Sequence, residues 1–273
     1  MESSTFRRFC AIAYEKAGIT LGDSKEALVE ARVGKRMRAL GMASEKEYLL
    51  RLEKDPSGEE IVQFLDVIST NHTSFFREPE HFELLRTLLA GWRREGRRRL
   101  RVWSAASSTG EEPYTIAFTI ADALEDSEMD WRILASDIST KVLAKAEAGV
   151  FADSKLTGLA RGELNRFFER GPNKDEHTVR PEMRAKIAFR RLNLITPPYP
   201  MRGPFDIIFC RNVMIYFDQA VRQRVISGME RLLRPGGYLL IGHAEALSGV
   251  RTGLRMIRPS VFLQSDAGAE VAQ

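Results

Sequence analysis

The sequence is poor in the residues that define several large classes of protein. Only two cysteines occur among its 273 residues, Cys10 and Cys210, which excludes a disulfide framework and a cysteine-based zinc site. No run of about 18 apolar residues is present, and the first ten residues, MESSTFRRFC, do not have the pattern of a signal peptide. These absences predict a cytoplasmic protein that does not insert into a membrane.

Patterns for metal binding and for nucleophilic catalysis are absent as well. The histidines are scattered through the sequence and show no metal-ligand spacing, so we expect no metal; they are His72, His81, His177 and His243. No Ser-His-Asp set and no Cys-His pair can be recognised. The formal net charge is only +4, which favours acidic partners without requiring nucleic acid.

One stretch has too few glycines for the role that its pattern suggests. RVWSAASSTGEEPYTIAFTIADAL, residues 101–124, begins like a buried strand, passes through small residues and continues as an amphipathic helix. Nucleotide-binding α/β domains share this plan, but here the turn contains one glycine, Gly110, and no GxGxxG. Glu111 and Glu112 would repel a pyrophosphate. S-adenosylmethionine, which has a sulfonium, an ammonium and ribose hydroxyls, fits these two acids better than a pyrophosphate does. The alternative is that Glu111 and Glu112 are ordinary acids at the start of a helix.

The order of the elements predicts helices followed by an α/β fold. Residues 1–75 contain only helical patterns, and from about residue 99 strands alternate with helices. Strands are expected at residues 100–105, 133–136, 187–192, 205–210, 238–241 and 258–265, with helices at 113–124, 141–148 and 219–233. This alternation predicts a mostly parallel sheet that binds its ligand beyond the carboxyl ends of the strands. We expect an N-terminal helical domain, 1–75, an α/β domain, 76–273, and a small insertion or antiparallel subdomain at about 150–190.

A basic helix is predicted within the helical domain. Asp23 and Glu26 have the spacing of a capping box before a helix that ends at Gly41. Apolar residues recur along what we expect to be its buried side, namely Leu28, Ala31, Met37 and Leu40. Its other side then carries a basic face, which consists of Arg32, Lys35, Arg36 and Arg38. A solvated surface is the default interpretation of such a face.

Polar residues at the ends of predicted strands are candidates for a ligand site. Asp137 is in the position from which an acid binds ribose hydroxyls, although it could instead cap the next helix. Asn193 could read an adenine edge or form a turn. Arg211 and Asn212 end another apolar strand and precede an aromatic-rich loop.

Five stretches together resemble the CheR-type chemotaxis receptor methyltransferases. They are NHTSFFREPEHF, RVWSAASSTGEEPYT, ASDI, FDIIFCRNVMIYFD and LLRPGGYLLIGHAEAL, in this order over most of the chain. The resemblance implies a helical domain followed by a Rossmann-like, S-adenosylmethionine-dependent methyltransferase domain with a small antiparallel β subdomain. It also implies methyl transfer to specific glutamate side chains on chemoreceptor cytoplasmic helices, which gives glutamyl methyl esters and S-adenosylhomocysteine.

By position within these motifs, the resemblance also implies which residues bind the cofactor. They are Asn71, Thr73, Arg77, Glu112, Asp137, Asn193, Leu194, Arg211 and Asn212. Arg77 would bind the carboxylate of the cofactor in two-point fashion, and the alternative is a surface charge. The catalytic candidates are Arg77 and Tyr216. The Tyr216 hydroxyl would position the incoming carboxylate, and the alternative is a packed aromatic ring.

The resemblance implies a partner as well. We expect a cytoplasmic monomer that is recruited to membrane receptor arrays, that binds no nucleic acid and that contacts the receptor cytoplasmic domain through the basic face. Two other classes of function stay open. One is a non-catalytic regulatory module that binds S-adenosylmethionine, and the other is a methyltransferase that acts on RNA or a small molecule.

Overall fold

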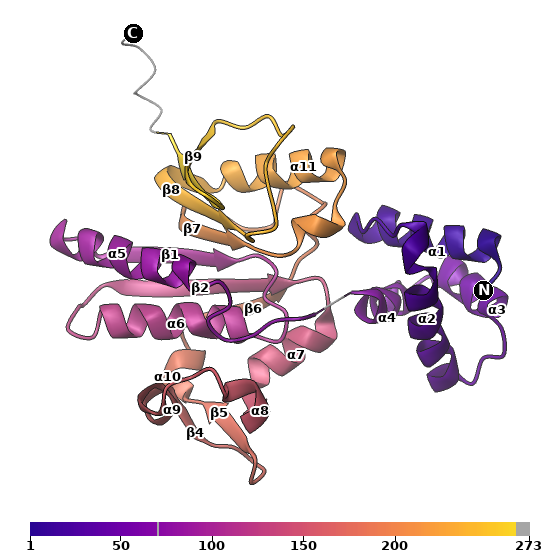
Figure 1. The fold of residues 1–273 in the computed structure, drawn as a ribbon, viewed down its shortest axis with the longest axis horizontal. Helices are drawn as coiled ribbons and strands as arrows, with labels where there is room; N and C mark the ends of the chain where they lie inside the picture. Colours follow the sequence, from indigo (N-terminus) through magenta and orange to yellow (C-terminus); the bar gives the residue numbers. More distant parts are fainter. Residues whose placement is uncertain (70, 266–273) are drawn as a thin grey trace.

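The N-terminal part of the computed structural model is a bundle of helices, and the structure describes residues 1–69 and 71–265. The elements of the bundle are α1 (Ser3–Ala17), the 3-10 helix η1 (Asp23–Lys25), α2 (Glu26–Leu40), α3 (Glu45–Lys54) and α4 (Glu59–Ile68) (Figure 1). The fully buried ring of Phe9 stacks on Phe64 and lies close to Tyr48. The bundle therefore has its own hydrophobic core, and the helices predicted here are confirmed.

Two predictions about α2 are wrong. Asp23 forms no capping box, because it begins η1 and no side chain caps the start of α2. The buried positions of α2 are Val29, Val33 and Met37, whereas Leu28 is 41% exposed. The two valines and Met37 recur at four-residue spacing and form one stripe, so Leu28, a single position before the first valine, points away from the core.

The basic face of α2 is only partly solvated. Both Nε and Nη2 of Arg36 donate to the buried carboxylate of Glu60, at 2.8 and 2.7 Å. Arg32 donates to main-chain carbonyls at the end of α4. Lys35 and Arg38 are exposed. The expectation of a solvated face is therefore wrong for Arg36, whose charge compensates a buried acid within the bundle.

A mixed sheet forms the second part of the molecule. Within the described residues its strands follow the order β6-β2-β1-β7-β8-β10-β9. Their bounds are β1 (Arg99–Ser104), β2 (Asp130–Asp137), β6 (Ile187–Arg191), β7 (Phe205–Cys210), β8 (Leu233–Ile241), β9 (Leu254–Arg258) and β10 (Val261–Gln264). The strands from β6 to β8 pair in parallel, and β10 is antiparallel to both β8 and β9. The predicted, mostly parallel sheet is confirmed, and β9 is an edge strand that the sequence did not predict.

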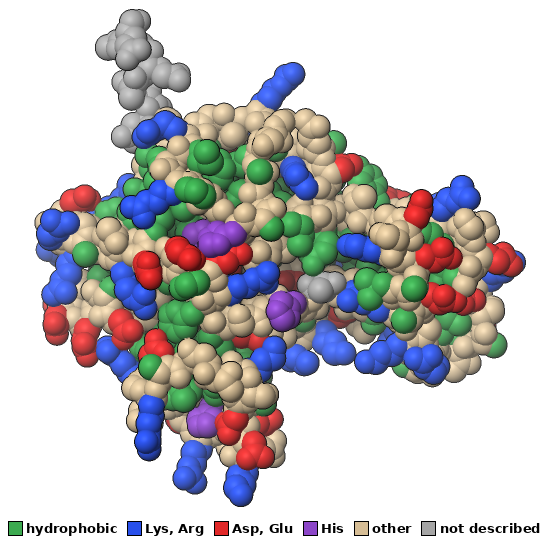
Figure 2. Space-filling model, viewed as in Figure 1, with side chains coloured by type: hydrophobic (Ala, Val, Ile, Leu, Met, Phe, Trp, Pro, Cys, Tyr) green, Lys and Arg blue, Asp and Glu red, His purple; other side chains and the backbone are tan. Residues whose placement is uncertain are grey.

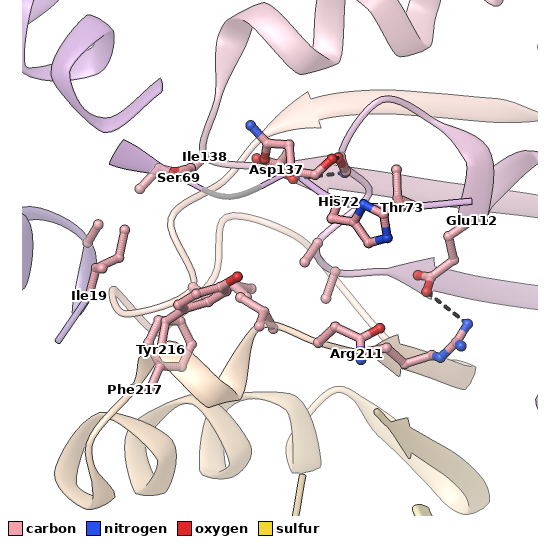
Figure 3. A pocket seen from close by; sticks show the side chains of 18 of the residues that line it. Ile19, Ser69, His72, Thr73, Glu112, Asp137, Ile138, Arg211, Tyr216 and Phe217 are labelled. Atoms are coloured by element: carbon pink, nitrogen blue, oxygen red, sulfur yellow. Dashed lines mark hydrogen bonds and ion pairs between the residues drawn. The ribbon is translucent and has the colours of Figure 1, made fainter. Parts of the chain in front are cut away.

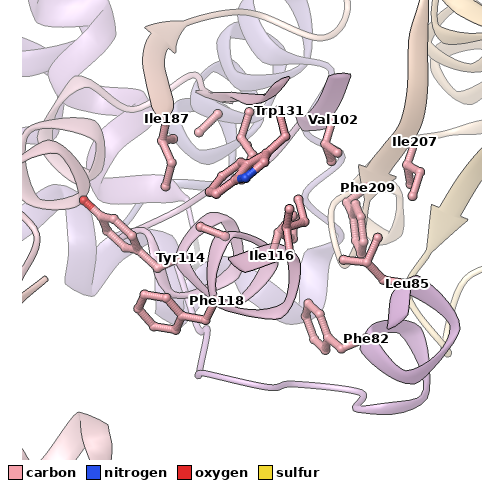
Figure 4. Close-up of a cluster of buried hydrophobic side chains, with 14 of the residues drawn as sticks. Phe82, Leu85, Val102, Tyr114, Ile116, Phe118, Trp131, Ile187, Ile207 and Phe209 are labelled. Carbon is pink, nitrogen blue, oxygen red and sulfur yellow. The ribbon is translucent and has the colours of Figure 1, made fainter. Parts of the chain in front are cut away.

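Helices cover both faces of the sheet. Their bounds are α5 (Glu80–Arg94), α6 (Glu111–Ala123), α7 (Thr140–Ala148) and α11 (Gln219–Glu230). Alternate side chains of β7 point to opposite faces: Ile207 and Phe209 join the core under α5 and α6, which Figure 4 shows, whereas Ile208 and Cys210 pack with α11. The strand is buried on both faces, as in other doubly wound folds.

Several element boundaries differ from those predicted. α11 ends at Glu230, before the predicted residue 233, because β8 begins at Leu233. Pro235, Gly236 and Gly237 lie inside this strand, and its pairing with β7 shifts register between Phe205 and Ile207. A bulge thus absorbs the proline and glycines. None of the described helices has the length and apolar character that crossing a membrane requires.

A small antiparallel sheet lies between β2 and β6 in the chain. Its strands, β3 (Val150–Ala152), β4 (Phe168–Arg170) and β5 (Glu176–Val179), follow the order β3-β5-β4. The short helices α8 (Asp153–Leu156) and α9 (Arg161–Phe167) lie between β3 and β4, and α10 (Pro181–Arg184) follows β5. Phe167 stacks on Phe118 of α6 with ring centroids 4.4 Å apart, which joins the subdomain to the main core. The antiparallel pairing agrees with the predicted subdomain, while the domain limits at residues 75 and about 150–190 stay predictions.

Candidate functional site

A cavity lies beyond the carboxyl ends of β1, β2, β6 and β7, against the helical bundle (Figure 3). It contains about 1140 Å³ of space, part of it open to solvent. Tyr216 and all of the predicted cofactor residues line it: Asn71, Thr73, Arg77, Glu112, Asp137, Asn193, Leu194, Arg211 and Asn212. Residues far apart in the sequence thus meet where the parallel strands end, at the position that this architecture uses for ligands.

The cavity has two walls of different character. The sheet wall consists of polar side chains that follow strands or begin α6: Glu112, Asp137, Arg211 and Asn212. The helical wall comes from the segment between α1 and α2 and from the first turn of α2, and it includes Ile19, Leu21, Lys25 and Leu28. Figure 3 shows Ile19 and Tyr216 at one end of the cavity and Glu112 with Arg211 at the other.

The loop between β1 and α6 is shaped by close packing rather than by phosphate binding. Gly110 has a φ of 103°, and a Cβ there would lie 3.0 Å from Cβ of Ala146 in α7. Ser108 also has a positive φ of 48°, and its backbone N–H donates to Asp137 at 2.9 Å. The single glycine of this loop is therefore explained by the approach of α6 to α7.

The two acids at the start of α6 have different surroundings. Glu112 lines the cavity, where it accepts hydrogen bonds from the Ser104 hydroxyl at 2.7 Å and from Arg211 Nη1 at 3.2 Å. Burial raises the pKa of Glu112 against the opposing effect of Arg211. Glu111 points elsewhere, toward Lys155 at 3.6 Å. Only Glu111 fits the description of a helix-start acid without a role in the cavity.

Asp137 organises the loops around it. One carboxylate oxygen accepts the Ser108 N–H at 2.9 Å, and the other accepts the Ser139 N–H at 3.0 Å. Burial raises the pKa of Asp137 despite these hydrogen bonds. The alternative role as the cap of α7 is wrong, because the Ser139 side chain accepts the Val142 N–H and caps that helix itself.

Asn193 holds a turn and also connects the two parts of the molecule. Its side-chain oxygen accepts the Ile195 N–H at 3.3 Å, as the turn interpretation requires. Its amide nitrogen donates to the Lys16 carbonyl at the end of α1, at 2.7 Å. Leu194 is buried beside it. The side-chain amide that would bind an adenine edge is therefore already engaged in hydrogen bonds to Ile195 and Lys16.

Arg211 is buried, and two acids compensate its charge. It donates to Glu112 and, through Nη2, to Glu78 Oε2 at 3.0 Å, while Asn212 Nδ2 donates to Glu78 Oε1 at 3.1 Å. Burial alone would raise the pKa of Glu78, but the hydrogen bonds from Asn212 and Arg211 hold it below its usual value. The sequence analysis missed Glu78, although it directly follows Arg77 in the quoted FFRE motif.

Glu245 is a second residue that the sequence analysis missed. Its carboxylate is 9% exposed and accepts three backbone N–H groups, from Asn212 at 2.9 Å, Gly242 at 2.6 Å and Ile215 at 3.2 Å. It thereby fixes the loop after β7 to the loop after β8. An acid between two alanines in the GHAEAL stretch was the available signal.

The segment before α5 closes another side of the cavity. Arg77 Nη1 donates to the His72 carbonyl at 2.8 Å, and the Asn71 carbonyl accepts the Ser108 hydroxyl at 3.4 Å. Thr73 lines the cavity as well. Arg77 is half-buried, so it is not the surface charge that was the alternative, and a second guanidinium edge stays available to a ligand.

Main-chain atoms join the helical wall to the sheet domain. The Thr20 N–H donates to the Tyr216 carbonyl at 2.8 Å. Gly18 ends α1 with a φ of 68°, and a Cβ there would lie 2.7 Å from Ile195 Cγ2 and 3.0 Å from Val221 Cγ1. The Lys25 ammonium lies 5.5 Å from the centroid of the Tyr216 ring. None of the four residues of the basic face lines the cavity.

Comparisons with known proteins agree with the motifs. The family model described as CheR methyltransferase, all-alpha domain, matches residues 4–69, and the one described as CheR methyltransferase, SAM binding domain, matches residues 71–262. The chemotaxis protein methyltransferase of Escherichia coli is 43% identical over 97% of this chain and 92% of its own. That of Salmonella typhimurium is 42% identical, over 92% and 86%. The expected fold, helices followed by a Rossmann-like methyltransferase domain, is confirmed, and the chain belongs to the CheR methyltransferase family.

Proposed function

We propose that this chain is the chemotaxis methyltransferase that transfers a methyl group from S-adenosylmethionine to glutamate side chains on chemoreceptor cytoplasmic helices. The products are glutamyl methyl esters and S-adenosylhomocysteine, and the role is adaptation. The observation that carries the proposal is the meeting of all the predicted cofactor residues around one cavity in a chain of this family.

The chemistry of the sheet wall fits a ligand that is cationic and rich in hydroxyls. Asp137 has acceptor capacity left for a ribose, and Glu112 has it for hydroxyls or the positive methionine end. Arg77 binds the methionine carboxylate, while Asn193 and Leu194 flank the adenine and Asn71 and Thr73 close over the ligand. Two buried carboxylates would oppose a phosphate, which argues against a nucleotide.

The reaction needs orientation more than proton transfer. When bound, the cofactor supplies a methyl group on a sulfonium, which is an electrophile that needs no metal. A glutamate carboxylate, whose ordinary pKa is about 4.3, is already ionised at neutral pH, so the chain needs no general base. A carboxylate oxygen forms the new bond to the methyl carbon as the carbon–sulfur bond breaks. The protein's task is to align these atoms and keep water out, and Tyr216 orients the incoming carboxylate.

The receptor contact is assigned to the exposed part of the basic face. Lys and Arg side chains gather over the lower part of the helical bundle in Figure 2. Of the basic face, Lys35 and Arg38 are exposed, while Arg36 is engaged with Glu60. Reversing the charge of Arg36 would unpair a buried acid and destabilise the bundle. Lys35→Glu with Arg38→Glu should slow receptor methylation several-fold and leave cofactor affinity unchanged; equal rates would remove the basic face from the proposal.

One experiment separates this function from its two alternatives. The protein is incubated with cofactor labelled in the methyl group and with receptor cytoplasmic fragments, and base-labile label is measured on the receptor. A fragment with its candidate glutamates replaced by alanine is the control. Label on RNA or a small molecule, or cofactor binding without transfer, would favour the respective alternative. Sedimentation tests the proposed monomer, and pull-down with receptor tails tests whether the β3-β5-β4 subdomain binds a receptor peptide.

A further inference from the structure

Two histidines that are far apart in the sequence meet beside the cavity. His81 lies in the first turn of α5, and His243 follows β8. Their rings pack edge to face with centroids 5.0 Å apart. Glu78 Oε2 lies 3.6 Å from His81 Nδ1, and ligand atoms of these three residues lie within 4.8 Å of one another. Histidines without metal-ligand spacing in the sequence can therefore still meet in the fold.

His81 is a buried polar group whose hydrogen bonds are missing. Its side chain is 3% exposed, and neither ring nitrogen has a hydrogen-bond partner among the described residues. A buried group without partners costs free energy, so native proteins nearly always satisfy it.

We propose that Glu78, His81 and His243 bind a divalent transition-metal ion, with Zn²⁺ as the best fit. Two imidazoles and one carboxylate suit zinc and its neighbours, whereas Mg²⁺ and Ca²⁺ prefer oxygen ligands. Glu80 Oε2 lies 3.8 Å from His243 Nε2 and supplies a fourth ligand or holds that ring by a hydrogen bond. His243 and Glu80 are exposed, so their side chains can move the short distance that closes the site.

The Glu78 carboxylate connects this site to two residues that line the cavity. Glu78 Oε2 faces His81 and also accepts Arg211, while Glu78 Oε1 accepts Asn212. A metal ion that takes Oε2 leaves Arg211 with Glu112 as its remaining acidic partner and releases part of the sheet wall. Metal binding therefore lowers cofactor affinity. This coupling rests on the proposed function of the cavity, whereas metal binding itself does not.

Zinc titration of the untagged full chain, stripped with a chelator, tests the site. Calorimetry should find one equivalent of ZnCl₂, and Co²⁺ should give the visible absorption of a site with nitrogen and oxygen ligands. His243→Ala, a change outside the cavity lining, should weaken zinc binding at least about tenfold. His177→Ala, another histidine that is not buried, is the matched control and should bind as the parent does. No bound zinc, or equal affinity with and without His243, would overturn the site.

The coupling is tested with S-adenosylhomocysteine, which binds without turnover. Its affinity should fall several-fold when Zn²⁺ is present, and His243→Ala should abolish this difference. Unchanged affinity in the zinc-loaded protein would overturn the coupling. A protein that binds zinc but transfers no methyl group would refute the proposed function and leave the metal site standing, so the two failures can be told apart.

Discussion

The two walls of the cavity are built in opposite ways. In the sheet wall, Asp137 and Arg211 are buried and the Glu112 side chain is 12% exposed, and each of the three makes at least two hydrogen bonds or ion pairs to the fold. The helical wall is mainly apolar, and Leu28 in it is 41% exposed. A wall whose polar side chains are fixed by hydrogen bonds before any ligand binds suits a small ligand of fixed shape. An open apolar wall suits a larger and variable partner. The difference assigns the cofactor to one side and receptor access to the other.

We expect the largest effect on cofactor affinity when the sheet wall loses the negative charge of Glu112. Glu112→Gln removes an acceptor for the ligand and leaves the buried Arg211 with only Glu78 as a charged partner. We expect cofactor affinity to fall about a hundredfold, or about 2.7 kcal/mol, measured by calorimetry. Glu111→Gln, one position earlier and outside the cavity lining, is the matched control. Equal affinities for the two variants would return Glu112 to the role of a helix-start acid.

A substitution at Gly18 tests whether the helical wall needs its place against the sheet. Gly18→Ala forces a side chain into a left-handed conformation and against Ile195 and Val221. Gly41→Ala is the matched control, because Gly41 also ends a helix with a positive φ of 66° but has open space around it. Gly18→Ala should lower the free energy of unfolding by about 2 kcal/mol more than Gly41→Ala does, measured by urea denaturation. Equal losses would mean that the approach of the bundle is not close.

A substitution at Glu245 tests how far the sheet wall depends on the backbone hydrogen bonds that this carboxylate accepts. In Glu245→Gln one carboxylate oxygen becomes an amide that faces backbone N–H donors, so the loop with Asn212 and Ile215 is released. We expect the rate of methyl transfer at saturating cofactor to fall about tenfold, equivalent to about 1.4 kcal/mol. Cofactor affinity should change less than the rate. A loss confined to affinity would show that this loop serves the cofactor alone.

We expect the smallest effect, on the rate of methyl transfer, from a substitution at Tyr216, which lies between the two walls. Tyr216→Phe keeps the ring beside Lys25 and removes only the hydroxyl. If the hydroxyl orients the receptor carboxylate, the rate should fall about fivefold with unchanged cofactor affinity, as expected for one hydrogen bond. An unchanged rate would favour the packed aromatic ring. Tyr216→Ala, which also removes the ring, shows whether the ring itself matters.

The sequence predicts the sheet wall better than the helical wall for a physical reason. Strand ends in a parallel sheet converge on one edge, so Asp137, Asn193 and Arg211 could be collected from periodicity alone. The helical wall depends on how the bundle packs against the sheet, which no local pattern encodes. The buried stripe of α2 was misplaced because Leu28 seemed a core residue by hydrophobicity, although it faces the cavity.

Buried acids were the other feature that could not be predicted from the sequence. For Glu78 and Glu245 the sequence offers only their places in the quoted motifs, because their partners are supplied by loops after other strands. The pairing of Arg36 with Glu60 was invisible for the same reason, because the two residues lie on different helices. Charge patterns indicate which faces are polar, but tertiary packing decides which charges are neutralised inside the fold.

The contacts across the boundary have a consequence for mutational tolerance. In the hydrogen bonds that join Thr20 to Tyr216 and Lys16 to Asn193, the helical bundle contributes only main-chain atoms. Replacing the side chains at positions 16 and 20 therefore leaves both hydrogen bonds in place. An alanine scan of the bundle would not detect their contribution. The bundle can change these side chains without losing the two bonds, whereas the hydrogen bond from the Tyr14 hydroxyl to Asp218, at 2.7 Å, depends on a side chain. Thr20→Pro, which removes the donor itself, is the substitution that this attachment does not tolerate.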